Sequence, residues 1–241
     1  MKPARFALLA LMFLAAPAWA QSGLELIEES LTRHAQPAYI YTEEILVLSD
    51  NLGQHTVRTV RHYAQRDDNG LKSLRVIDTP AELRGIEISV VRDARGAARR
   101  GADPLSQVFG SDFSVVDLEG EQPQNFVYTR SEDLELERIT HHVVRALPRD
   151  EAVARATGYA ERRIYLRKDN LFISRIDYHD RRGRLARRET FRDPRPDETG
   201  AWRAGMILME NLRDQRRSLL KIERRVHSRD YIPADTFARL P

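Results

Sequence analysis

Alternation of apolar and polar side chains dominates the chain after Pro37. Over 39–48, one set of alternate positions is Tyr, Tyr, Glu, Ile, Val and the other is Ile, Thr, Glu, Leu, Leu, which is the period of a β-strand. Clusters rich in Asn, Asp and Gly follow at 49–53 and 67–70, and such clusters are typical of hairpin turns. The same pattern predicts further strands at 56–63, 72–78, 85–92, 125–130, 137–146, 160–167, 171–178, 185–192, 204–213 and 218–227.

Helical periodicity is confined to short stretches. Leu24, Ile27 and Leu31 share one stripe of an opening helix, with acidic residues gathered toward its start, where the helix dipole favours them. We expect a second short helix within 148–157 and a turn or short helix over 231–240. About ten strands joined by short turns predict a mainly β, α+β protein with an antiparallel meander in one curved sheet. The concave face of that sheet must be filled by a helix, by side chains or by an apolar ligand.

The first twenty residues differ from the rest. Lys2 and Arg5 precede an apolar run over 6–16, and Pro17-Ala18-Trp19-Ala20 then provides an Ala-x-Ala cleavage site. The alternative is a membrane anchor, but the run is shorter than the roughly 20 residues that a bilayer requires. We therefore predict a cleaved secretory signal peptide at 1–20 and a single soluble domain at 21–241. The bacterial periplasm is the expected location, with secretion beyond the cell as the alternative.

Composition narrows the function classes. Without residues 1–20 the chain has 37 Lys and Arg against 36 Asp and Glu, so it lacks the net field of a dedicated nucleic-acid binder. It has no cysteine, which excludes a lipid-modified N-terminal Cys, disulfides and thiolate metal sites. Hydrophobic residues make up 41% and charged residues 31%, as expected of a folded globular domain rather than a disordered chain.

Charge is unevenly distributed within this balanced total. The stretch 117–151 carries nine acidic and four basic residues, whereas 155–195 carries six acidic and thirteen basic residues. One interpretation is a face that binds phosphate head groups or an acidic partner, because the arginine fork suits phosphate. The other is that adjacent acidic and basic strands pair across the sheet. The arginines concerned surround one predicted turn: Arg181, Arg182, Arg184, Arg187 and Arg188.

Catalytic and metal-binding motifs are not evident. The sequence contains no phosphate loop, dinucleotide fingerprint or Gly-x-Ser-x-Gly elbow. Ser111 lies in Gly-Ser-Asp without the second glycine of a nucleophile elbow, so we do not predict a hydrolase. Asp177 and His179 share a strand face, but two ligands do not make a closed metal site. We therefore predict no enzyme activity, no cofactor and no metal.

The stretch 108–118 has a structural interpretation of its own. Gly110 permits a positive φ, and Asp112 and Asp117 can bind backbone amides of a loop that Phe109 and Phe113 anchor in the core. The alternative is direct ligand contact by this loop.

Strand alternation also provides candidate cavity residues. Three sets each share one face of a predicted strand, and each set is either part of the core or the lining of a pocket. In the third set a methionine is soft enough to accommodate variable chains. The sets are Ile86, Ile88 and Val90; Phe172, Ile176 and Tyr178; and Trp202, Met206 and Leu208.

The loop at 110–118 resembles the Gly-Ser-Asp-Phe-x-x-x-Asp-Leu signature of the LolA-like family of periplasmic outer-membrane lipoprotein-sorting proteins. Supporting elements follow in the family order, including Arg84-Gly85-Ile86, the turn at 178–183, Trp202 and Met209-Glu210-Asn211. The signature residues are Gly110, Ser111, Asp112, Phe113, Asp117 and Leu118.

The resemblance implies a half-open antiparallel β-barrel wrapped over helices, with an apolar cavity that shields acyl chains. It favours a carrier or chaperone for lipids or lipoproteins in outer-membrane lipoprotein sorting or lipid transport. The alternative function is an accessory or sensor that docks an envelope transporter or signalling protein through its arginine-rich face. At 91–107 the chain lacks the Trp-x-Tyr-x-Pro strand of the family, so we expect one strand and two aromatic residues to be missing there.

Overall fold

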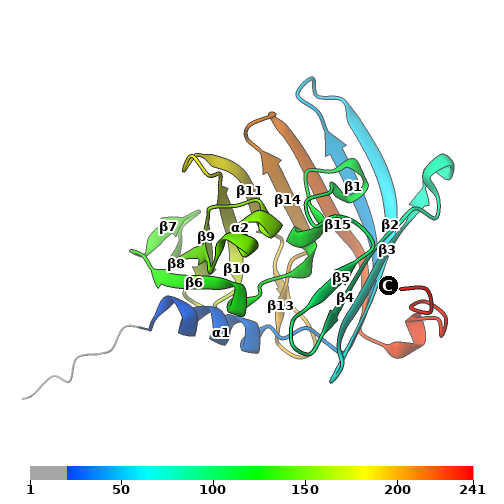
Figure 1. The fold of residues 1–241 in the computed structure, drawn as a ribbon, viewed down its shortest axis with the longest axis horizontal. Helices are drawn as coiled ribbons and strands as arrows, with labels where there is room; N and C mark the ends of the chain where they lie inside the picture. Colours follow the sequence, from blue (N-terminus) through cyan, green and yellow to red (C-terminus); the bar gives the residue numbers. More distant parts are fainter. Residues whose placement is uncertain (1–20, 241) are drawn as a thin grey trace, which may run out of the picture.

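A computed structural model describes residues 21–240; the predicted signal peptide at 1–20 and Pro241 lie outside the described residues. Most of this part of the chain forms one large curved antiparallel sheet (Figure 1). Two α-helices accompany it, α1 (Gly23–Arg33) and α2 (Glu151–Thr157). The strands are β1 (Tyr39–Ser49), β2 (His55–Asp67), β3 (Gly70–Thr79), β4 (Glu87–Asp93), β5 (Ala98–Arg100), β6 (Phe126–Arg130), β7 (Leu134–Leu136), β8 (Ile139–Pro148), β9 (Glu161–Arg167), β10 (Ile173–His179), β11 (Leu185–Arg192), β12 (Arg195–Pro196), β13 (Trp202–Arg203), β14 (Met206–Asn211) and β15 (Arg216–Val226).

The sheet consists of two meanders rather than the single one predicted: the first contains β1 to β5, and the second contains the strands of the main sheet from β6 to β15. Across the sheet the order is β5-β4-β3-β2-β1-β15-β14-β11-β10-β9-β8-β6, with β7 added beside β8, while β12 and β13 form a separate pair. The first and last long strands are neighbours, with Leu46 of β1 opposite Leu220 of β15. Because β5 and β6 lie at opposite edges, the sheet does not close, and it forms the half-open barrel that the resemblance implies.

A long connection links these two edges. The segment 101–125 leaves β5 at one edge of the sheet and enters β6 at the other. It contains the signature loop and short 3-10 turns, including Val108–Gly110 and Val115–Glu119. Phe113 and Val115 in this segment are almost completely buried, together with Ile77, Ile164 and Leu166 of the sheet. The core therefore lies between the sheet and this crossing segment.

Helix α1 lies close against strand β6. A capping box at Ser22 begins the helix, and a Cβ added at Gly23 would come within 2.9 Å of the β6 backbone. This close approach buries Leu26 and Ile27 completely and leaves Leu24 40% exposed. The predicted apolar stripe was thus wrong at Leu24, because the buried face of the helix includes Gly23, Leu26, Ile27 and Ser30 instead.

The structure also corrects the expected loss of a strand at 91–107. Residues Ala98–Arg100 form the short strand β5, with Arg100 opposite Val90 of β4. A strand is therefore present at this edge, although it has only three residues and no aromatic side chain. All eleven strands and both helices that the sequence predicts are present, whereas β5, β7, β12 and β13 were not predicted.

Candidate functional site

A cavity of about 680 Å³ lies between the concave face of the sheet, the helices and the crossing segment. Its volume is within the range of about 300–1,000 Å³ that ligand pockets occupy. Three inward-facing side chains form an apolar row, because Leu220 of β15 lies opposite Ile207 of β14, which lies opposite Phe191 of β11. Other apolar lining residues include Leu31 of α1 and Leu118 of the signature loop. The cavity therefore has one continuous apolar wall.

Only some of the predicted cavity residues line this space. Ile88 packs against the core from a partly buried position, Val90 is buried within the core, and Ile86 is 49% exposed. Met206 and Leu208 are absent from the lining; Ile207, on the opposite face of β14, occupies it instead. Four of the nine predicted residues line the cavity, although ligand contact by them stays a prediction: Phe172, Ile176, Tyr178 and Trp202.

The rest of the lining is strongly charged. Seven arginines and five carboxyl groups face the cavity, and most are paired. Glu119 accepts from both Arg92, at 2.9 Å, and Arg100. Glu121 accepts from Arg162 at 2.6 Å, and the Arg162 guanidinium lies 3.6 Å from the centroid of the Phe126 ring. Because a buried charge without a partner is costly, these pairs allow charged groups to remain inside the fold.

Glu189 has no arginine of its own within ion-pair distance among the described residues. Its carboxylate accepts a hydrogen bond of 2.6 Å from the Tyr178 hydroxyl, and both side chains are buried. Burial, and then the nearby negative charge of Asp117, raise the pKa of Glu189 to about 8. We therefore expect Glu189 to be protonated at pH 7, which removes one negative charge from the cavity wall.

The signature loop is fixed by its second aspartate. Asp117 accepts from the Ser114 backbone N–H at 2.7 Å, from the Tyr159 hydroxyl at 2.8 Å and from the Arg187 guanidinium at 2.6 Å. This is the structural role predicted for Asp117, and the φ of +74° at Gly110 is the positive value predicted there.

Asp112 acts through side chains rather than loop amides. Ser218 donates to its carboxylate at 2.9 Å, Arg216 at 3.0 Å and Asn211 at 3.2 Å. These contacts bind the signature loop to β14 and β15. Ser111 is almost completely buried and accepts from the Phe113 N–H, and no hydrogen bond within residues 21–240 joins it to a histidine.

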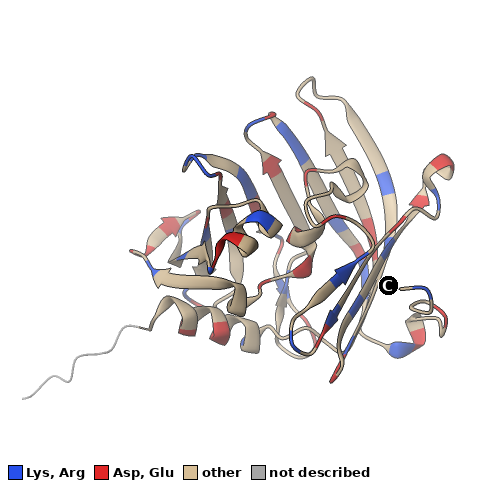
Figure 2. Ribbon diagram, in the orientation of Figure 1, with Lys and Arg blue, Asp and Glu red and all other residues tan. Residues whose placement is uncertain are grey.

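The five arginines predicted as a partner face do not share one surface. Arg187 points inward and also donates to the Asp112 carbonyl at 2.7 Å, whereas Arg188 lies on the outer face against Asp177 at 2.8 Å. Figure 2 shows basic residues gathered at the turn between β10 and β11. The other three lie in the turn between β10 and β11: Arg181, Arg182 and Arg184.

Within 21–240, no group of three or more His, Cys, Asp or Glu side chains is placed to hold a metal ion. No helix in the same range has the length and apolar character needed to cross a membrane.

Comparison with solved structures identifies the fold. A putative outer membrane lipoprotein-sorting protein domain from Vibrio parahaemolyticus matches with a TM-score of 0.78 at 18% identity, covering 89% of this chain and 95% of that chain. A DUF1329 family protein from Desulfovibrio piger matches with a TM-score of 0.76 at 20% identity and the same coverage. A LolA superfamily protein from Nitrosomonas europaea matches with a TM-score of 0.65 at 14% identity, covering 88% of this chain and 100% of that chain. The chain has the LolA-like fold.

The sequence itself also matches a family. A family model described as "-like: Uncharacterized protein" matches residues 94–239, more than half of the chain, and the chain belongs to that family. A search of the curated proteins finds no match. The match includes the signature loop and all strands from β6 to β15. It therefore includes the crossing segment and the part of the sheet that this segment enters.

Sequence reasoning missed most of the charged lining. Glu44, His62 and Arg75 come from three separate strands, and only the register of the sheet brings them together. A local signal was present nonetheless. Glu44 shares its strand face with Ile40 and Leu46, and a carboxylate among apolar inward positions indicates a buried polar site.

Proposed function

We propose that this protein is a non-enzymatic periplasmic carrier that shelters the acyl chain of a lipid or lipoprotein in the cavity of its LolA-like fold. The supporting observation is the cavity of about 680 Å³ with one continuous apolar wall beneath the crossing segment. Transfer of each CH₂ group out of water contributes about 0.8 kcal/mol, so a 16-carbon chain gains roughly 10 kcal/mol before losses. That gain is large enough to keep such a chain out of water during transport.

The arrangement of the lining supports an amphiphilic ligand. Apolar side chains of β11, β14 and β15 form one wall, whereas most of the charged groups come from β1 to β5, β9 and the crossing segment. The remaining charged groups are Glu189 of β11, Arg203 of β13 and Arg225 of β15. A lipid has the same division between an apolar chain and a polar head. The alternative function, docking of an envelope partner through an arginine face, gains no support from the fold, because Arg187 and Arg188 lie on opposite faces of β11.

The proposal is tested by looking for the ligand directly. Protein expressed with its leader and purified without detergent should carry lipid that native mass spectrometry and solvent extraction detect. Delipidated protein should then bind a fluorescent fatty acid. A protein that is always empty and binds no such probe contradicts the carrier function.

A cavity-filling variant assigns the binding to the cavity. We expect Ile207→Trp to weaken fatty-acid binding at least tenfold, because the larger ring occupies space beside Phe191 and Leu220. Val57→Trp is the matched control, because Val57 is exposed on another strand of the same sheet. Equal binding by both variants would place the fatty acid elsewhere, and thermal unfolding of each variant verifies that it is folded.

A further inference from the structure

A row of polar side chains crosses the concave face of the sheet. Arg225 of β15 lies opposite Thr42 of β1, which lies opposite His62 of β2, which lies opposite Arg75 of β3. All four side chains line the large cavity, and Glu44 lies beside them on β1. We call these five residues the polar row. Ile222 and Ala64 lie next to it in the lining.

The polar row has more positive than negative charge. Glu44 is its only carboxylate; it accepts from the Thr42 hydroxyl at 2.6 Å and lies 3.5 Å from Arg75 Nε. That contact is not a hydrogen bond, so the buried Arg75 Nε has no hydrogen-bond acceptor. Burial, and then the positive charges of Arg75 and Arg225, hold the pKa of His62 well below its usual value, and His62 is neutral at pH 7. The polar row thus has two arginines and one carboxylate.

Arg225 is the arginine that this carboxylate does not neutralise. Among residues 21–240 its only hydrogen bond is from one terminal nitrogen to the Ala204 carbonyl at 2.9 Å, and no carboxylate of these residues lies within 4.0 Å of it. The neighbouring Arg203, in contrast, binds Asp197 at 2.9 Å and donates to the His34 carbonyl at 2.7 Å. Burial, and then the charge of Arg203, lower the pKa of Arg225.

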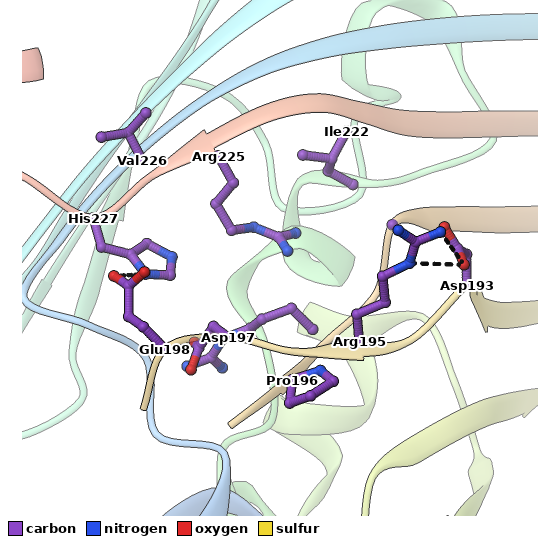
Figure 3. Close-up of a pocket in the computed structure, with 11 residues that line it drawn as sticks. Asp193, Arg195, Pro196, Asp197, Glu198, Ile222, Arg225, Val226 and His227 are labelled. Carbon is purple, nitrogen blue, oxygen red and sulfur yellow. Dashed lines mark hydrogen bonds and ion pairs between the residues drawn. The ribbon is translucent and has the colours of Figure 1, made fainter. Parts of the chain in front are cut away.

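The position of Arg225 is also unusual. Together with Arg203, Ile222 and His227, it lines both the large cavity and a second cavity of about 480 Å³ beside the β12–β13 hairpin. Figure 3 shows its guanidinium extending into this second cavity without a dashed line to any residue drawn.

Two of the three carboxylates that line the second cavity have an arginine partner, and the third, Glu198, has a side chain that is 79% exposed. Asp193 binds Arg195 at 3.2 Å, Asp197 binds Arg203, and Glu198 lies 3.8 Å from His227. Arg225 is therefore a cation without a carboxylate at the junction of an apolar space and a polar one.

We propose that Arg225 binds the negatively charged oxygens of an anionic lipid head group, a carboxylate or a phosphate ester, while the acyl chain of the same lipid lies in the large cavity. This inference rests on the proposed carrier function and specifies its ligand class. A guanidinium presents several donors in a planar fork that matches such oxyanions, and charge-assisted hydrogen bonds are the strong ones. The second cavity provides room for the remainder of the head group.

A competition experiment tests this assignment. A fatty acid, the alkyl phosphate and the fatty alcohol of the same chain length each displace the neutral probe Nile red from the purified delipidated protein. In the wild type we expect at least one of the two anions to displace it at roughly tenfold lower concentration than the alcohol, because a charged hydrogen bond contributes about 1.5–3 kcal/mol. The more effective anion identifies the head group as a carboxylate or a phosphate.

Variants locate the preference. Arg225→Gln keeps a donor for the Ala204 carbonyl and should remove the difference between anion and alcohol, whereas Arg225→Lys should retain part of it. Arg66→Gln is the matched control, because Arg66 also lines the cavity without a carboxylate within 4.0 Å but is exposed and lies outside the polar row. Unchanged melting temperatures exclude misfolding as the cause.

Three outcomes are distinguishable. Equal displacement by anions and alcohol in the wild type, or equal weakening of all three by Arg225→Gln, overturns the head-group site and leaves the carrier function intact. Loss of the preference in Arg66→Gln as well as in Arg225→Gln shows a general field of the cavity and also overturns it. A wild type that binds neither Nile red nor any competitor overturns the carrier function itself.

Discussion

The two faces of the β10–β11 strand pair carry buried carboxylates that differ in their number of cationic partners. On the outer face, Asp177 accepts from Arg188 at 2.8 Å and from Arg175. On the inner face, Arg187 binds the buried Asp117, and Glu189 binds only the Tyr178 hydroxyl. Adjacent residues of a strand point to opposite faces, so the sequence neighbours Arg187 and Arg188 bind different carboxylates, Asp117 and Asp177.

The difference shows how each face accommodates charge. On the outer face Asp177 is also buried, with a side chain 5% exposed, but it has two arginines and so keeps a cation when one of them is lost. An inner charge has no such replacement and must be paired or neutral. Arg187 is an example of pairing, and Glu189, with a pKa of about 8, is an example of neutralisation.

The largest expected effect comes from breaking the inner pair. We predict that Arg187→Gln lowers the free energy of unfolding by about 4 kcal/mol, because Asp117, with a side chain only 1% exposed, loses its cation. Arg188→Gln should cost about 1 kcal/mol or less, since Asp177 keeps Arg175. Urea unfolding followed by circular dichroism measures both.

A double variant separates the lost charge from lost packing. In Asp117→Asn with Arg187→Gln no buried charge is left without a partner, so we expect part of the stability to return. Equal costs for Arg187→Gln and Arg188→Gln would show that the two faces do not differ in this way.

Much of the fold follows from local pattern. Alternation and turn clusters predicted strands at 39–48 and 56–63, which lie within β1 (Tyr39–Ser49) and β2 (His55–Asp67), because a half-buried strand requires period two. The pairing of β1 with β15 was not predicted, since these strands are far apart in sequence and either could have been an edge.

The cavity was less predictable than the fold. At 206–209 the sequence is Met-Ile-Leu-Met, so both faces of β14 are apolar, and alternation alone cannot show that Ile207 rather than Met206 faces the cavity. The polar row is a harder case, because Arg225 and Arg75 come from strands of different meanders. Only the β1–β15 pairing brings them to one level of the sheet.

The second largest expected effect is a pH dependence of the free energy of unfolding, which has opposite signs for Glu189 on the inner face and Asp177 on the outer face. Unfolded glutamate loses its proton near its ordinary pKa of 4.5, whereas folded Glu189 keeps it to about pH 8. Between these two pH values the folded protein holds one more proton than the unfolded chain. The contribution of Glu189 to the free energy of unfolding is therefore fully present below pH 4.5 and is lost as the pH rises to about 8. We predict a fall of up to about 3 kcal/mol between pH 5.5 and 7.5 from this group.

Glu189→Gln should flatten this dependence, because the amide mimics the protonated acid. Asp177 provides the contrast: burial raises its pKa, but hydrogen bonds from Arg175 and Arg188 outweigh this and lower it. Its contribution is therefore present above pH 3.8 and lost as the pH falls below that value. Thermal or urea unfolding from pH 3 to 9 tests both signs, and a wild-type profile that rises between pH 5.5 and 7.5 and is unchanged in Glu189→Gln contradicts the assignment.

The smallest effect is expected at the turn between the two strands. Arg182 is exposed and has no carboxylate within 4.0 Å among residues 21–240, whereas Arg184 binds Asp180 at 2.8 Å. We predict that Arg182→Glu changes the free energy of unfolding by less than about 0.5 kcal/mol. An exposed turn residue without an ion pair is hydrated in both the folded and the unfolded chain, so its replacement removes no interaction of the folded state. Urea unfolding measures this, and Nile red binding should also be unchanged, since the turn lies outside the cavity lining. A pull-down from envelope extract with Arg182→Glu then tests the docking alternative separately from the cavity. If the wild type captures a partner and Arg182→Glu does not, the turn has a role in docking that is independent of the cavity.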